Sequence, residues 1–130
     1  MGAMKESGQF LAGVELFNAH KFFQAHEVWE ELWLVELEPE KSFLQGLIQL
    51  AAACHHQGRG NPRGARSLAT TGLAKLAHFP DDHRGIAVAK LRSDADKWLE
   101  TLGGEGDSGA QTLPRIRLVA RFSRENEPGR

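Results

Sequence analysis

The chain has 130 residues, 41% hydrophobic and 25% charged, which is the composition of one globular domain and excludes a disordered chain. Sixteen Lys and Arg residues against seventeen Asp and Glu residues leave a net charge of -1. This near-neutral charge excludes a basic field over the whole molecule, so we expect neither nucleic acid nor a membrane as a partner.

The cysteine content and the absence of targeting signals indicate the compartment. Cys54 is the only cysteine, which excludes an internal disulfide and fits a reducing environment. No apolar run reaches the roughly 18 residues of a membrane span, and residues 1–8 contain no apolar stretch resembling a signal peptide. We therefore expect a cytoplasmic protein.

Apolar residues recur at the 3.6-residue period of an α-helix almost throughout the chain, and no segment shows the sustained alternation of a strand. The cleanest stripe is formed by Val88, Leu91, Ala95, Trp98 and Leu102. The stripes predict five helices, at residues 6–19, 22–37, 40–57, 62–78 and 83–102. The predicted fold is all-α, a single compact bundle of about five helices with an extended C-terminal segment.

The breaks between the stripes contain residues that start or end helices. Pro39 suits the first turn of the third helix, and Gly58 and Gly60 can end that helix in a left-handed conformation. Asn61 precedes a proline and is expected to cap the fourth helix. Asp82 is the expected cap of the fifth helix.

These boundaries divide the chain into a helical domain, residues 5–102, and a flexible, mostly irregular tail, residues 103–130. Two interpretations of the tail remain open. It is either a solvated terminus, or a locally basic arm for an acidic partner, since it contains five Arg residues. Pro114, Ile116 and Leu118 could also lie extended in a groove.

Polar residues interrupt the apolar face of the second predicted helix. His26 and Glu30 are four residues apart, so they share a face and can touch, and Glu27 lies next to them. On the third predicted helix Gln45, Gln49 and His56 lie on one stripe among apolar neighbours.

A short link makes the second and third helices antiparallel neighbours. Buried polar groups need partners, so we expect these two polar stripes to face each other. The sequence therefore predicts a buried cluster of His26, Glu30, Gln49 and His56, with His55 on its edge.

Three interpretations of this cluster remain open. It is a structural network that fixes helix register, a small-molecule or divalent-metal site with His26, Glu30 and His56 as ligands, or an acid–base site with Glu30 or Glu27 as the base and His26 as its partner. The metal interpretation has a weakness, because residues 26–30 read H-E-x-x-E and lack the second histidine of the H-E-x-x-H zinc motif.

The remaining candidates have simpler explanations. Cys54 falls on the apolar stripe of the third helix and is expected to be inert core. His20, His78 and His83 lie at helix ends, where solvated side chains are expected.

Three blocks of this sequence resemble a known family. The first block is Phe17-Asn18, Phe22 through Glu30 and Trp33; the second is Phe43 through Ala52, His55-His56, Gly60-Asn61 and Gly64-Ala65; the third is Leu73 through Leu76, Gly85-Ile86 and Leu91. Together they are similar to the Domain of Unknown Function 309 family of small all-helical proteins, over roughly residues 10–102. His20 departs from the family, which usually has a small residue such as glycine in that turn.

The resemblance implies an all-α helical bundle and no assigned activity. It also implies that the polar residues belong to the family's pattern positions: His26, Glu27, Glu30, Gln45, Gln49 and His56. We therefore expect a binding or interaction module with an unidentified protein or small-molecule partner. The alternatives are a metal-dependent, hydrolase-like enzyme and a homo-oligomeric structural module. The cofactor is unknown, either a divalent metal ion or none.

Overall fold

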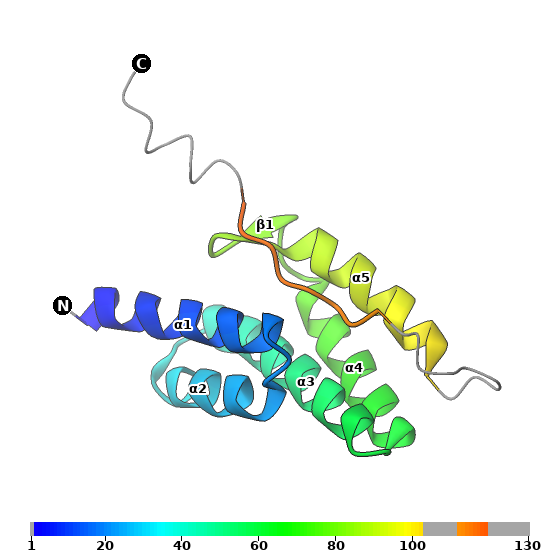
Figure 1. The fold of residues 1–130 in the computed structure, drawn as a ribbon. Helices are drawn as coiled ribbons and strands as arrows, with labels where there is room; N and C mark the ends of the chain where they lie inside the picture. Colours follow the sequence, from blue (N-terminus) through cyan, green and yellow to red (C-terminus); the bar gives the residue numbers. More distant parts are fainter. Residues whose placement is uncertain (1, 103–111, 120–130) are drawn as a thin grey trace.

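The computed structural model describes residues 2–102 and 112–119, and this part of the chain confirms the predicted all-α fold. Five helices occur in it, with a small antiparallel hairpin before the last one. The elements are α1 (Gly2–Asn18), α2 (Phe22–Val35), α3 (Glu40–Gly58), α4 (Pro62–Leu76), β1 (Asp82–His83), β2 (Ile86–Ala87) and α5 (Val88–Thr101). Helix α3 contacts both α2 and α4, and α5 packs on α4 (Figure 1).

The apolar stripes form one core, as the helical periodicity predicts. The side chains of Trp29 and Trp98 are its largest fully buried members. The Trp29 indole Nε1 donates a hydrogen bond to the Phe10 carbonyl (3.1 Å), so the ring is satisfied as well as buried. Gly13 lies directly against this indole, which allows α1 to approach α2 closely.

Helices α3 and α4 also approach closely because small residues face each other. A Cβ added to Gly72 would come within 2.8 Å of the Gly46 carbonyl oxygen. The turn between them follows its predicted chemistry: Asn61 Oδ1 accepts a hydrogen bond from the Gly64 N–H (3.1 Å), and Gly60 has a φ of 79°. The predicted cap of α4 is therefore confirmed.

The prediction of a helix from residue 83 is wrong, because residues 82–87 form the β1–β2 hairpin. His83 pairs with Ile86, which leaves a two-residue turn with Arg84 at a φ of 53° and Gly85 at 83°. Two consecutive positive φ values are the mark of a tight hairpin turn and cannot occur in a right-handed helix. Helix α5 therefore begins at Val88, and Ala87 rather than Asp82 precedes it as the N-cap residue.

Residues 112–119 pack against the helices rather than forming a solvated terminus, which among the alternatives left open agrees with Pro114 and Ile116 lying in a groove. Pro114, Ile116 and Val119 are buried, and Leu118 forms an antiparallel bridge with Ile86 of β2. In Figure 1 this orange segment runs along α5 to the hairpin. The remainder of the predicted tail, residues 103–111 and 120–130, lies outside the described residues.

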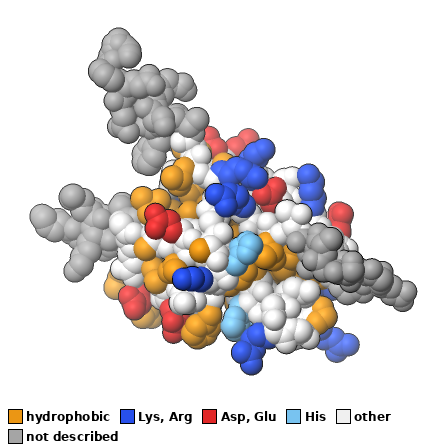
Figure 2. All heavy atoms as spheres, viewed as in Figure 1, with side chains coloured by type: hydrophobic (Ala, Val, Ile, Leu, Met, Phe, Trp, Pro, Cys, Tyr) orange, Lys and Arg blue, Asp and Glu red, His pale blue; other side chains and the backbone are white. Residues whose placement is uncertain are grey.

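Two further observations describe the surface. No helix in the described part of the chain is both long and apolar enough to cross a membrane. On the face drawn in Figure 2, acidic and basic side chains both occur, and apolar side chains reach the surface between them. This mixture fits the net charge of -1.

Candidate functional site

The predicted pair on α2 forms, but it is not buried. The His26 Nδ1 atom lies 4.0 Å from Glu30 Oε1, as expected for residues four apart on one helix face. However, the Glu30 side chain is 53% exposed, and Glu27 is exposed as well. The expectation that Glu30 belongs to a buried cluster is therefore wrong, because this carboxylate lies on the exposed side of α2.

The polar residues of α3 do not complete this pair. Gln45, Gln49 and His56 are half-buried. Gln49 lies beside α4, since a Cβ added to Gly72 would come within 3.2 Å of the Gln49 Cβ. His56 Nδ1 lies 3.2 Å from Asn61 Nδ2 in the α3–α4 turn. The rotation of α3 about its axis therefore turns this stripe toward α4 rather than toward His26.

His55, the neighbour of His56, is the histidine that approaches His26. The Phe23 ring stacks on the His26 ring, with centroids 6.1 Å apart and planes at 8°, and the same ring lies 5.3 Å from the His55 centroid. Phe23 thus bridges two histidines from α2 and α3. The sequence placed His55 only at the edge of the cluster.

The predicted metal ligands are not assembled into one site. Within residues 2–102 and 112–119, no three His, Cys, Asp or Glu side chains are grouped so that they could hold a metal ion. His26 Nδ1 and Gln49 Oε1 are buried atoms without a hydrogen-bond partner among the described residues. The geometry therefore gives no ligand set of His26, Glu30 and His56.

Instead, α2 presents an acidic hollow. Glu27, Glu30, Glu31 and Leu34 line a shallow depression of about 260 Å³ on its outer face. Next to it the chain exposes three apolar side chains, of which the most exposed is Leu37, at 80%; the other two are Leu34 and Val35. We call this surface, residues 27, 30, 31, 34, 35 and 37, the acidic face.

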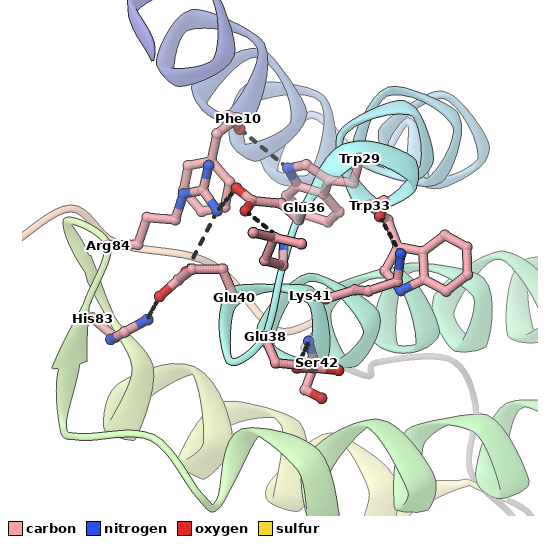
Figure 3. Close-up of polar contacts among 11 residues, drawn as sticks. Phe10, Trp29, Trp33, Glu36, Glu38, Glu40, Lys41, Ser42, His83 and Arg84 are labelled. Carbon is pink, nitrogen blue, oxygen red and sulfur yellow. Dashed lines mark hydrogen bonds and ion pairs between the residues drawn. The ribbon is translucent and has the colours of Figure 1, made fainter. Parts of the chain in front are cut away.

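The other acidic residues of this region hold the hairpin in place. Arg84 Nη1 lies 3.3 Å from Glu36 Oε2 and 3.5 Å from Glu40 Oε1, and its guanidinium covers the Phe10 ring (Figure 3). His83 Nε2 lies 2.8 Å from Glu40 Oε2. His83 is therefore half-buried and paired, which corrects the expectation that it is solvated.

The sequence analysis missed these contacts of His83 and Arg84 with Glu36 and Glu40 because it assigned residues 83–87 to a helix. The signal that could have revealed it is Gly85, one residue after a charged turn position, a pattern typical of two-residue hairpin turns. The strained φ of Arg84 is held by its two carboxylate partners and by the Phe10 ring.

Cys54 is confirmed as a core residue. Its side chain is 2% exposed, and burial raises the pKa of its thiol well above the ordinary range. The thiolate that nucleophilic chemistry requires is therefore not available at neutral pH.

Comparison with known proteins agrees with the resemblance seen in the sequence. Residues 10–68 match the model of the family described as "Domain of unknown function (DUF309)". An uncharacterized protein of Aquifex aeolicus (strain VF5) is 31% identical over 102 residues, which are 78% of this chain and 31% of that protein. The uncharacterized protein YpuF of Bacillus subtilis (strain 168) is 33% identical over 90 residues, 68% of this chain and 49% of YpuF.

This chain thus spans less than half the length of both relatives. The matched residues include all of α2 and α3 and the turn to α4, and α2 and α3 contain all six polar pattern positions. Over residues 10–68 the chain belongs to the DUF309 family of domains of unknown function.

Proposed function

We propose that this chain is a binding module that docks a basic, partly apolar protein segment on the acidic face. The observation that carries the proposal is the hollow lined by Glu27, Glu30, Glu31 and Leu34. Three carboxylates beside an apolar side chain complement a segment in which lysine or arginine residues lie next to an apolar side chain.

The carboxylates of this hollow are not neutralised within the described chain. Glu27 and Glu31, four residues apart, repel each other on one helix face, as do Glu27 and Glu30. Among the residues whose side chains the structure describes, 8–102 and 112–119, no Lys or Arg forms an ion pair with any of them. This repulsion lowers the stability of α2, and a bound cation would remove it.

The apolar part of the acidic face adds a second reason for a partner. Leu34, Val35 and Leu37 are exposed within four consecutive positions, at the end of α2 and the start of the link to α3. Isolated exposed apolar residues are ordinary, whereas a contiguous patch beside a charged hollow is typical of interaction sites.

The other residues at the family's pattern positions lie outside the acidic face. The His26 ring, stacked on Phe23, lies beside Glu30. We assign Gln49 and His56 to the packing of α3 and its turn, because Gln49 lies beside Gly72 of α4 and His56 lies beside Asn61. A reducing compartment, the cytoplasm, suits the free thiol of Cys54.

The proposal is tested by titrating the protein into a short fluorescent peptide of alternating lysine and leucine and measuring anisotropy. We expect saturable binding that weakens as salt is added. Glu27→Gln and Glu30→Gln should each weaken binding by about twofold to fivefold, the equivalent of ~0.4–1 kcal/mol for an exposed pair. Leu34→Ser should weaken it too.

Glu100→Gln, an exposed carboxylate on α5, is the matched control and should leave binding unchanged. An equal loss in Glu100→Gln would mean that the peptide only senses net charge, and the proposal would be wrong. Light scattering on the protein alone tests the homo-oligomer alternative. If the protein self-associates and Leu34→Ser abolishes this association, the exposed apolar side chains bind a second copy of the chain instead.

A further inference from the structure

A second hollow lies at the opposite end of α2 from the acidic face. The α1–α2 turn, the start of α2, the end of α3, Arg59 and Leu113 of the C-terminal segment line an open hollow of about 610 Å³. Its residues are different from those of the acidic face, so the two surfaces can be tested separately.

The lining of this hollow has one sign of charge. Lys21 comes from the α1–α2 turn and Arg59 from the α3–α4 turn, and His20 and His55 also line the hollow. No Asp or Glu lines the hollow. Neither Lys21 nor Arg59 forms an ion pair with a described residue. Two exposed cations from different elements therefore converge on one space.

Backbone donors add to this positive potential. Helix α2 has no side-chain cap at Lys21, and its first helical bond runs from the Ala25 N–H to the Lys21 carbonyl (3.0 Å). The N–H groups of Phe23 and Gln24 precede that bond and meet no acceptor among the described residues. In contrast, the carbonyls of residues 55–57 at the end of α3 accept hydrogen bonds from the N–H groups of residues 59–61. The start of α2 therefore adds two backbone donors to the hollow.

One wall of the hollow is apolar. Phe22, Cys54 and Leu113 line it, and the Phe23 ring, half exposed, stands at its side. A small inorganic ion would leave this wall uncovered. A ligand that combines a multiply charged anion with an aromatic body would use both the cations and the rings.

We propose that this hollow binds a small phosphate monoester with an aromatic or apolar body. The phosphate would lie between Lys21 and Arg59 near the free N–H groups of α2, and the body would lie against Phe22 and Phe23. Phosphate is favoured over a carboxylate because two separate cations and two backbone donors suit a tetrahedral dianion.

The test is a titration of the protein with phenyl phosphate, followed by amide NMR, with inorganic phosphate as the comparison. We expect saturable shifts of the Phe23 and Gln24 amide signals. Phenyl phosphate should bind at least fivefold more tightly than inorganic phosphate. Phe23→Ala should remove that advantage, and Lys21→Ala and Arg59→Ala should each weaken phenyl phosphate by about fivefold.

Lys90→Ala, an exposed cation on α5, is the control and should bind phenyl phosphate like the parent protein. Equal affinity for the two anions would make this a free-phosphate site and overturn the monoester assignment. Loss of affinity in Lys90→Ala, or shifts spread over α5, would overturn the site itself. The acidic face is unaffected by either result.

Discussion

The carboxamide of Asn18 makes two hydrogen bonds with the backbone of Ile116, which lies 98 residues later in the chain. Asn18 Nδ2 donates to the Ile116 carbonyl (2.8 Å), and the Ile116 N–H donates to Asn18 Oδ1 (2.9 Å). An amide side chain carries one acceptor and two donors, so it can replace a neighbouring strand for one residue. This clamp fixes the C-terminal segment to the end of α1.

Replacement of Asn18 by alanine should therefore release residues 112–119 before the helices unfold. Two hydrogen bonds are lost, so we expect a destabilisation of about 1–3 kcal/mol in chemical denaturation. The amide of Ile116 should also exchange faster with solvent. Asn61→Ala removes a helix cap instead and should cost about 1 kcal/mol without this local effect. Equal exchange at Ile116 in both variants would contradict the clamp.

The periodicity of the sequence predicts most of the fold, because each helix buries one stripe. Val88, Leu91 and Trp98 are buried as their spacing requires. The C-terminal segment carries no such pattern: Ile116 is buried, whereas Leu118 is 54% exposed. Its placement depends on contacts with Asn18, with Asp94 and with the β1–β2 hairpin, and none of these leaves a periodic signal near residue 116.

In the candidate site, too, the sequence predicts contacts within one helix but not contacts between helices. Contact between His26 and Glu30 follows from helical spacing alone. Whether His55 or His56 turns toward α2 depends on how α3 rotates about its axis. That rotation is set by the close contact of Gly46 with Gly72 on α4, which the sequence of α2 and α3 does not contain.

The contact between Gly13 and Trp29 leads to a prediction with an unusual sign. Alanine in place of glycine normally stabilises a helix by up to about 1 kcal/mol. At Gly13, however, the new Cβ would collide with the Trp29 indole, so Gly13→Ala should cost about 1–3 kcal/mol. Gly8→Ala has no atom within 4 Å of its Cβ and should stabilise the protein. Thermal melts of both variants check this, and stabilisation by Gly13→Ala would refute the packing.

The turn between α1 and α2 contains a strained residue. His20 has a φ of 64°, a conformation that suits glycine, the residue type that the family resemblance leads us to expect here. His20→Gly relieves this strain but loses the stacking of the His20 ring on Phe22. The net effect should be a rise of about 0.5–1 kcal/mol in the free energy of unfolding. Ala19→Gly, at a position without positive φ, should lower it by a similar amount. Denaturant titrations of both variants measure these opposite signs.

Cys54 gives a prediction about pH. Because burial raises the pKa of its thiol in the folded state, the thiolate forms first in the unfolded chain. The unfolded state therefore binds fewer protons above the ordinary thiol pKa of about 8.5, and stability should fall as pH rises beyond it. The difference between the parent protein and Cys54→Ala isolates this slope from the titration of lysines. The native thiol should resist a thiol reagent at pH 8 until denaturant is added. Rapid labelling of the folded protein would show that Cys54 is accessible, and an unchanged slope in Cys54→Ala would show that other groups cause it.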